Sequence, residues 1–366
     1  MRALVTGGAE REVAHLAVEF QRRGWEVAVI SMLPLEPPIS DLTDLGVATY
    51  SLEMRQGVPD PRALVRLGRI LRRFRPTVLH AHMVHANLLA RLSRLVAPTP
   101  VVISTLHSEN EGRQWRYLAY RLTNRLSNAT TTVSRAAQLE ATRRRAAPAG
   151  SILLVPNGLD TAAYAPDAAA RDRARRSLDL GDRFTWLAVG NLVEAKGYPD
   201  MLRAFAAALQ ARPDATLLVA GAGRLEGELR RLAHEAGLDR AVRFLGRRTD
   251  VPELLQAADG FVMTSRWEGL PMALLEAGAS SLPVVATDVG GSRDAVVDGV
   301  SGYLTPVADP VATARALTQV MRRSAEDRRA MGAAGRRHVR ETFEIGVVAD
   351  AWERLYAGAG RTTDGG

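Results

Sequence analysis

Short apolar runs alternate with amphipathic stretches along most of the chain. The clearest amphipathic stretch predicts a helix over residues 61–74, where Leu64, Leu67, Ile70 and Leu71 share one face and Pro76 follows the end. Apolar runs predict strands, and the segments between them predict further helices. In the first half, strands are expected at 3–6, 26–30, 49–52, 78–80, 101–105, 129–133 and 152–155, and helices also at 7–23, 86–96, 114–126 and 135–144.

The same alternation restarts after a polar, alanine-rich stretch at residues 167–182. Strands are expected at 185–189, 216–220, 242–245, 260–263 and 284–287, each followed by a helical pattern. Such alternation predicts parallel sheets covered on both faces, so the expected fold class is α/β with two doubly wound Rossmann-like domains. We expect these domains at residues 1–165 and 166–343, a helix at 344–358 that packs back on the first domain, and a flexible tail at 359–366.

Bulk composition narrows the class of protein. A chain of 366 residues exceeds one ordinary core of ~100–200 residues, which favours two domains. No apolar run approaches the ~18 residues of a membrane span, and the start from Met1 to Thr6 is too short for a signal-peptide core. We therefore expect a cytoplasmic protein. The chain has no cysteine, which excludes disulfides and thiolate chemistry.

Positive charge is concentrated in the first half. Residues 1–150 hold 21 arginines and 12 acidic residues, whereas the remainder carries a net charge of −1. The excess would suit an anionic acceptor, or peripheral contact with the inner face of an anionic membrane, although arginines spread over solvated helix faces would give the same composition. No basic strip interleaved with aromatic residues is present, so nucleic acid is not an expected partner.

The stretch from Ser265 to Glu276 carries the strongest chemical signal. Glu268 is expected in the loop after the strand at 260–263, and Glu276 inside an apolar helix whose first turn Pro271 suits. A carboxylate among apolar residues needs a partner or a ligand hydroxyl. Gly269 lets a ligand approach the helix N-terminus, which attracts anions. A nucleotide sugar, with hydroxyls at both ends and an anion between them, has the matching shape. The alternative interpretation is the carboxylate pair of a glycosidase, but that enzyme needs a dedicated proton donor, and the sequence singles none out.

Lys196 is the only lysine among 48 basic residues. It lies in the loop after the strand at 185–189, and parallel sheets bind ligands at the ends of strands where such loops begin. An ammonium is a compact charge, suited to a phosphate whose charge changes during a reaction. Lys196 is therefore a candidate phosphate-binding residue.

Histidines and glycine turns give less specific signals. His80, His82, His85 and His107 could suggest a metal site, but two of them are expected in packing or hydrogen-bonding roles, and no metal is expected. His107, at a strand end, is a better candidate for contact with a substrate. The glycine pattern at 221–227 departs by one position from the dinucleotide fingerprint, which disfavours a nicotinamide enzyme, and no cofactor is expected.

Taken together, these motifs resemble the retaining glycosyltransferases of family 4, which have the GT-B fold of two Rossmann-like domains facing each other across a cleft. The most specific match is Glu268-Gly269-Leu270-Pro271 through Glu276, the E-x7-E signature of that family. Gly7-Gly8-Ala9-Glu10 resembles its N-terminal glycine loop, Val155 to Asp160 its interdomain turn, and Gly190 with Lys196-Gly197 its phosphate-binding loop.

The resemblance implies three residues close to the chemistry. Glu268 would form hydrogen bonds with hydroxyls of the transferred sugar, Lys196 would bind the diphosphate, and His107 would lie beside the sugar. Breaking the sugar–phosphate bond leaves extra negative charge on the diphosphate, which an ammonium and free helix amides can stabilise without a metal.

The resemblance also implies a set of donor-binding residues. Glu276 would bind the ribose hydroxyls. Asn191 stands where the family usually has an arginine beside the lysine, which leaves one fixed positive charge there instead of two, unless Arg266 or Arg248 substitutes. The remaining donor-binding residues would act mainly through their backbone: Gly8 near the phosphates, Gly269 and Leu270 at the sugar, and the loop that carries Arg248 at the base.

The expected function is metal-independent, retaining transfer of a hexose-type sugar from a nucleotide sugar, with UDP as the expected nucleotide. The second domain would bind the nucleotide sugar, and the first would bind a hydroxyl acceptor on a glycan, a lipid-linked molecule or a natural product. Two alternatives remain from the sequence: a nucleotide-sugar epimerase or hydrolase on the same fold, and a non-catalytic nucleotide-sugar-binding protein.

Overall fold

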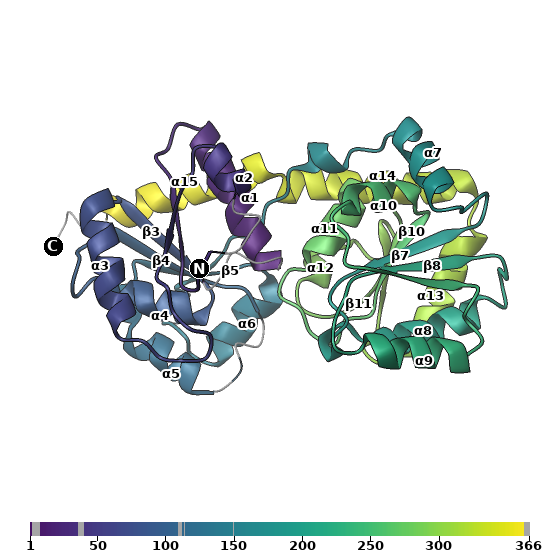
Figure 1. The fold of residues 1–366 in the computed structure, drawn as a ribbon, viewed down its shortest axis with the longest axis horizontal. Helices are drawn as coiled ribbons and strands as arrows, with labels where there is room; N and C mark the ends of the chain where they lie inside the picture. The colour runs from purple at the N-terminus through teal and green to yellow at the C-terminus, as the bar shows by residue number, and fades with distance from the viewer. Residues whose placement is uncertain (2–7, 36–39, 109–111, 113, 149, 362–366) are drawn as a thin grey trace. The chain divides into compact units, whose positions relative to one another are not determined.

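The computed structural model describes residues 1, 8–35, 40–108, 112, 114–148 and 150–361, and the chain divides into two compact units (Figure 1). Unit 1 combines Met1–Leu159 with Ile345–Gly366, and unit 2 holds Asp160–Glu344. The strand expected at residues 3–6 lies outside the described residues. The other expected strands are all present. Turn residues before and after each apolar run mark where the strand begins and ends.

Unit 1 contains two parallel sheets among its described residues. Four strands pair in the order β3-β4-β5-β6, and β1 pairs with β2 alone. The elements are α1 (Gly8–Arg22), β1 (Ala28–Ser31), α2 (Ser40–Asp44), β2 (Ala48–Ser51), α3 (Arg62–Phe74), β3 (Val78–His82), α4 (Val84–Ser93), β4 (Val101–Leu106), α5 (Gln114–Leu122), η1 (Asn124–Leu126), β5 (Ala129–Thr132), α6 (Arg135–Arg143), β6 (Ile152–Leu154) and α15 (Ile345–Arg361).

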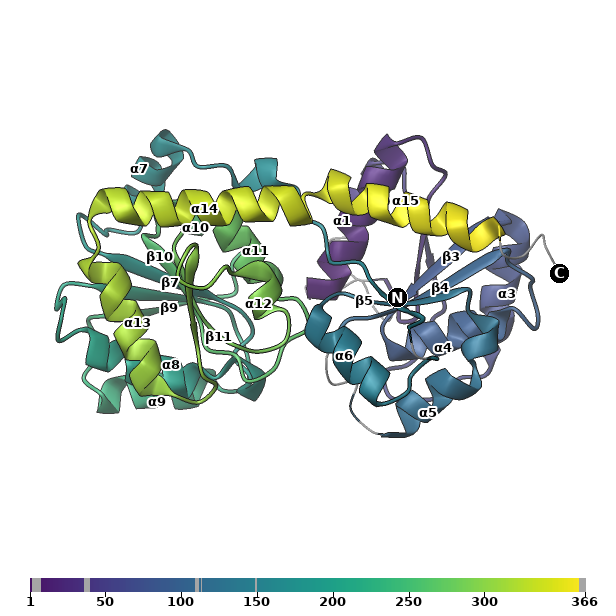
Figure 2. The same cartoon turned by 180° about the vertical axis from the view of Figure 1, so that it is seen from behind.

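The last helix of the chain belongs to the core of unit 1. Val348 and Trp352 on α15 are buried in one cluster with Phe20 on α1 and Ile103 on β4. Figure 2 shows α15, in yellow, running along this unit. The helix extends to Arg361, so residues 359–361 of the expected flexible tail are helical instead.

Unit 2 contains one sheet of six parallel strands in the order β12-β11-β10-β7-β8-β9. Its core includes Trp186 on β7 and Phe205 on α8, both almost fully buried. The elements are η2 (Thr161–Tyr164), α7 (Ala168–Ser177), β7 (Thr185–Val189), η3 (Glu194–Lys196), α8 (Tyr198–Ala208), β8 (Thr216–Ala220), α9 (Glu226–Glu235), β9 (Val242–Gly246), α10 (Val251–Ala257), β10 (Gly260–Met263), α11 (Met272–Ala279), β11 (Val284–Thr287), α12 (Ser292–Ala295), β12 (Gly302–Thr305), α13 (Pro310–Arg322) and α14 (Ala325–Phe343).

Three local features differ from the sequence prediction. The helix expected over 114–126 breaks after Leu122, and a short 3-10 turn follows. The polar stretch at 167–182 contains a helix, α7, because the Asp167 carboxylate caps it by accepting from the amides of Ala169 and Ala170. The edge strand β12 was not predicted, since four residues beginning with Gly302 give too short an apolar pattern. None of the helices in the described part of the chain is long and apolar enough to cross a membrane.

Candidate functional site

Strand β10 and the loop after it position the two glutamates of the candidate site. All of β10 is buried, as are Thr264 and Ser265, so the loop starts inside unit 2. Pro271 takes the N-cap position with an extended backbone, and α11 begins at Met272, one residue later than expected. Glu268 therefore lies in the loop, and Glu276 lies on α11 with only 1% of its surface exposed.

Lys196 and Glu268 are in direct contact. The Lys196 ammonium forms an ion pair with Glu268 Oε1, and Ser265 Oγ donates a hydrogen bond to the same oxygen at 2.6 Å. The side chains of Lys196 and Glu268 are 24% and 13% exposed, so both charges are partly shielded from water and attract each other more strongly than on an open surface. The ion pair with Glu268 therefore orients the Lys196 ammonium before an anionic ligand binds to it.

Two glycines allow the loops around this pair to pack backbone against backbone. Gly197 has a φ of +60°, and a Cβ there would lie 2.1 Å from the carbonyl oxygen of Thr264. Gly290, in the loop after β11, has a φ of +49°, and its Cβ would lie 2.1 Å from the carbonyl oxygen of Glu268. No side chain fits at either position. The loops after β7 and β11 thus both pack closely against the loop after β10, which carries Glu268.

Arg266 supplies a second positive charge next to the turn that holds Lys196. Asn191 is exposed in the loop after β7. The amide of Arg266 donates to Ala195 O at 2.7 Å, which places Arg266 next to the Lys196 turn. Its guanidinium lies 3.3 Å from the carboxylate of Asp200, so that acid offsets part of its charge. Arg266 is the better-placed substitute for the missing arginine.

Arg248 lies elsewhere in unit 2. It is exposed in the loop after β9, where it forms an ion pair with Asp250, and this bond raises its pKa. The strand order β10-β7-β8-β9 separates this loop from the one that carries Glu268. Arg248 is therefore not gathered with Lys196, Glu268 and Ser265.

Gly269 and Leu270 continue the Glu268 loop toward α11. Gly269 O accepts a hydrogen bond from Gly291 N at 2.6 Å, and Leu270 is buried. The carbonyl of Gly269 thus fixes the chain direction at the entrance to the helix. This bond ties the short segment between the two glutamates to the loop after β11.

In unit 1, His107 lies directly after β4 and bonds to a second histidine. Its Nε2 is 2.9 Å from Nδ1 of His82, at the end of β3. His80 bonds Tyr356 on α15 at 2.8 Å and Thr105 at 2.7 Å. Burial lowers the pKa of His107 to about 4 and that of His80 to about 3, and it lowers the pKa of His82 well below its usual value. All three rings are therefore neutral near pH 7.

The remaining predicted residue of unit 1, Gly8, is the exposed first residue of α1. Its predicted neighbour Gly7 lies outside the described residues. Within the described ranges, no group of three or more His, Asp or Glu side chains could hold a metal ion.

Sequence reasoning assigned no role to two polar residues, Ser265 and Glu12. Ser265 directly precedes the glutamate loop, and its position at the end of a buried strand was the available signal. Glu12 lies on α1, 2% exposed, and both its carboxylate oxygens accept from the amide of Gly158, at 2.9 and 3.0 Å. Burial raises the pKa of Glu12 to about 8. Its spacing with Leu16 and Phe20 places it on the buried face of α1, but nothing in that spacing indicates its partner Gly158.

Two family models match the two halves of the chain. The model described as "Glycosyltransferase Family 4" matches residues 6–163, and the one described as "Glycosyl transferases group 1" matches residues 170–338. Three similar curated proteins are bacterial. A glycogen synthase of Mycobacterium tuberculosis is 27% identical over 98% of this chain and 92% of its own length.

A GDP-mannose-dependent alpha-(1-6)-phosphatidylinositol monomannoside mannosyltransferase of the same organism is 31% identical over 80% of this chain and 78% of its own length. A UDP-Gal:alpha-D-GlcNAc-diphosphoundecaprenol alpha-1,3-galactosyltransferase of Escherichia coli is 26% identical over 72% of this chain and 71% of its own.

Solved structures show the same fold. The Anabaena protein Alr3699/HepE, in complex with UDP-glucose, superposes with a TM-score of 0.86 at 20% identity and covers 98% of both chains. The sucrose-phosphate synthase of Thermosynechococcus elongatus superposes with a TM-score of 0.79 at 23% identity, over 96% of this chain and 93% of that one. The two units are thus the two Rossmann-like halves of a GT-B fold.

Proposed function

Because the chain belongs to glycosyltransferase family 4, we propose that it transfers a hexose-type sugar from a nucleotide sugar, a UDP-sugar first among the candidates, to a hydroxyl acceptor with retention of configuration and without a metal ion. The activity as a glycosyltransferase follows from the family. The donor, the stereochemical outcome and the independence of metal are the proposal.

The observation that carries the proposal is the contact of Lys196, Glu268 and Ser265 beside the N-terminus of α11. Cleavage of the sugar–phosphate bond adds negative charge to the diphosphate. An ammonium and the free amides at a helix N-terminus stabilise that charge, and a fixed donor of this kind contributes ~10²–10³ to a rate. Glu268 holds the ammonium in place before the donor arrives.

The two glutamates have different roles in this proposal. Glu268, partly exposed, accepts hydrogen bonds from hydroxyls of the transferred sugar while it orients Lys196. Glu276, buried on α11, accepts from the ribose hydroxyls. A carboxylate accepts two hydroxyl bonds from adjacent oxygens, which a neutral amide cannot do equally well.

His107 acts as a neutral group beside the sugar. Its pKa of about 4 keeps it uncharged at pH 7, so it can form hydrogen bonds without repelling the positive charge that develops on the sugar ring. The acceptor hydroxyl gives its proton to the departing phosphate and attacks the same face, which retains configuration and requires no metal ion.

The acceptor is proposed to be presented at an anionic membrane surface. Trp115, Leu118 and Leu122 form an exposed apolar stripe on α5, and the same segment carries Arg121 and Arg125. Apolar side chains flanked by arginines suit insertion among anionic lipid headgroups. Cosedimentation with phosphatidylglycerol vesicles, but not with phosphatidylcholine vesicles, would support this part, and equal binding to both would contradict it.

The enzymatic proposal is tested with Lys196→Ala and Glu276→Gln. Both variants should lose at least about 100-fold in turnover with UDP-glucose, UDP-N-acetylglucosamine or GDP-mannose, whichever proves to be the donor, while the melting temperature of the free protein is kept. Arg230→Ala is the matched control, because Arg230 is an exposed residue paired with Glu226 on α9.

Several outcomes distinguish the alternatives. Normal turnover in both site variants would refute the assignment, and activity lost on addition of EDTA would refute independence of metal. A new nucleotide sugar formed without an acceptor would indicate an epimerase. Donor binding in thermal shift without turnover on any acceptor would indicate a non-catalytic binding protein.

A further inference from the structure

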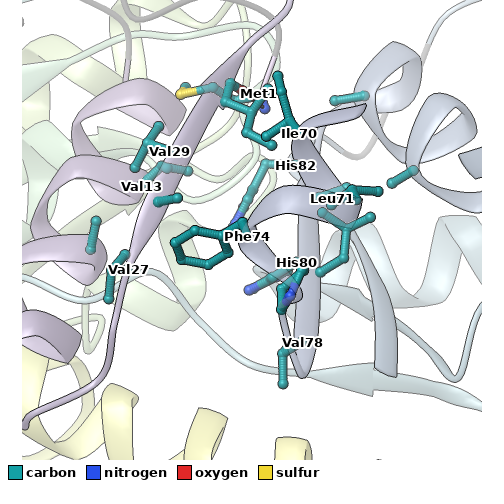
Figure 3. Close-up of a pocket in the computed structure, with 18 of the residues that line it drawn as sticks. Met1, Val13, Val27, Val29, Ile70, Leu71, Phe74, Val78, His80 and His82 are labelled. Atoms are coloured by element: carbon teal, nitrogen blue, oxygen red, sulfur yellow. Dashed lines mark hydrogen bonds between the residues drawn. The ribbon is translucent and has the colours of Figure 1, made fainter. Parts of the chain in front are cut away.

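In each unit, buried polar side chains bond to residues of the candidate site. In unit 1, the buried ring of His82 bonds to His107, and Figure 3 shows His82 among the side chains that line a pocket of that unit. In unit 2, the hydroxyls of Tyr198 and Thr264, both almost fully buried, bond to the turn that carries Lys196. Because a buried side chain does not touch a ligand itself, its effect on the ligand passes through the residue that it holds.

The turn that carries Lys196 runs from Gly190 to Tyr198, and we call it the lysine turn. Its two ends are joined, because Tyr198 Oη donates a hydrogen bond to Gly190 O at 2.9 Å. Burial, with a smaller contribution from the charge of Glu268, raises the pKa of Tyr198, so the hydroxyl keeps its proton and remains a donor. A side-chain hydroxyl therefore closes the lysine turn.

The stem of Lys196 passes beside the same hydroxyl. A Cβ built on Gly190 would lie 3.4 Å from Lys196 Cε, 3.6 Å from its Cδ and 3.4 Å from Tyr198 Oη. The far end of the lysine stem and the tyrosine hydroxyl thus lie on the same side of Gly190. Because the lysine stem is flexible, the position of its ammonium depends on what the stem packs against.

The second hydroxyl, on Thr264, holds the backbone of Lys196. Thr264 directly follows β10, and its Oγ1 lies 3.2 Å from Lys196 O and 3.1 Å from Gly197 O, so its proton is shared between two carbonyls. The loop that begins at Thr264 also carries Glu268. Thr264 therefore joins the two segments whose side chains form the ion pair, and it fixes the point from which the lysine stem starts.

We propose that the hydroxyls of Tyr198 and Thr264 position Lys196, one at the far end of its stem and one at its backbone, so that the ammonium is in place before the diphosphate of the donor binds. The proposed function supplies the identity of that anion, and the inference rests on it to that extent. The leaving diphosphate gains negative charge in the transition state, and a displacement of about 1 Å in a group that stabilises it lowers the rate. Tyr198 and Thr264 are thus positioning residues that act through Lys196.

The first test observes Lys196 directly, since it is the only lysine of the chain. In protein labelled with ¹³C at the lysine Cε, a fixed stem gives two separate Hε resonances, whereas rotation among staggered rotamers averages them. The parent protein should give two. Tyr198→Phe and Thr264→Val each remove a hydroxyl and keep the shape of the side chain, so each should reduce the separation by about half or more. Thr264→Ser keeps the hydroxyl and should retain the separation.

The second test measures the consequence for the reaction. The donor is whichever of UDP-glucose, UDP-N-acetylglucosamine and GDP-mannose the parent turns over. Tyr198→Phe and Thr264→Val should lower kcat about tenfold and change the KM for the donor less than about threefold, because the affected interaction strengthens in the transition state. Thr264→Ser should restore kcat. Tyr303→Phe is the matched control: Tyr303 on β12 accepts from Arg323 at 2.6 Å, so this variant loses a hydroxyl bond away from the lysine turn and should change neither readout.

A single Hε resonance in the parent, or unchanged resonances in both Tyr198→Phe and Thr264→Val, would overturn the proposal. So would an altered spectrum with an unchanged kcat, or a loss of kcat that Thr264→Ser shares with Thr264→Val. If Tyr198→Phe does not fold, the two variants at residue 264 still decide. If the parent turned over no nucleotide sugar, the proposed function would fail, while the Hε resonances would still show whether the two hydroxyls position Lys196.

Discussion

Replacing Glu12 with glutamine should change how the stability of unit 1 depends on pH. The folded protein raises the pKa of Glu12 from an ordinary 4.5 to about 8, mainly through burial. A carboxyl group with a raised pKa stabilises the fold fully below its unfolded pKa and loses that contribution as pH rises through the folded value. Each pKa unit corresponds to about 1.4 kcal/mol, so the total loss is on the order of 5 kcal/mol.

Most of this loss falls in an accessible pH range. Between pH 6 and pH 9, the linkage predicts that unit 1 loses about 3 kcal/mol, because the folded state must give up a proton that the unfolded state has already released. Glu12→Gln keeps an oxygen that can accept from the Gly158 amide but removes the ionisation. The variant should therefore be roughly as stable at pH 9 as at pH 6.

Hydrogen exchange of β4 measures the effect within unit 1, which avoids treating a chain of two units as a single two-state system. Glu228→Gln serves as the control, since Glu228 is exposed on α9 in unit 2. The protection of β4, corrected for intrinsic exchange, should fall from pH 6 to pH 9 in the parent chain and in Glu228→Gln, but not in Glu12→Gln. An equal fall in all three proteins would refute the reasoning.

Three further substitutions test the packing around the sites. Gly197→Ala places a Cβ 2.1 Å from a carbonyl oxygen, so it should lower the free energy of unfolding, measured by urea titration, by more than about 2 kcal/mol. Gly227→Ala is the control: no atom lies within 4 Å of its Cβ, and it should not lower that free energy. Ser265→Ala removes a bond to the Glu268 carboxylate and should lower kcat/KM by about tenfold with little change in melting temperature. Arg91 is fully buried and donates four hydrogen bonds, so Arg91→Met should lower the free energy of unfolding by about 3 kcal/mol. An unchanged urea midpoint would show that those bonds contribute little to stability.

The pattern of apolar runs was enough to predict both Rossmann-like units, because buried parallel strands leave a strong signal. The loop after β10 could also be identified, since Glu268 and Glu276 lie on either side of a helix start. What could not be predicted is that Lys196 touches Glu268. That contact depends on the register by which β7 and β10 pair, and on two glycines that let their loops meet.

Glu12 and the His82–His107 pair show a different limit. A single acidic residue on an apolar helix face usually turns toward water, so its burial against Gly158 depends on a turn nearly 150 positions away. Similarly, His82 and His107 meet only because β3 and β4 are neighbours. Sequence spacing along one strand carries no information about the side chain that lies across from it.

The position of α15 affects how the protein is made. The helix is synthesised after unit 2, yet Val348 and Trp352 complete the core of unit 1 around Phe20 and Ile103. A nascent chain on the ribosome must therefore hold its first 159 residues without a finished core while the whole of unit 2 is translated. During that interval the apolar surface that α15 later covers is open to chaperones and to other nascent chains, and deletion of α15 would leave unit 1 permanently in that state.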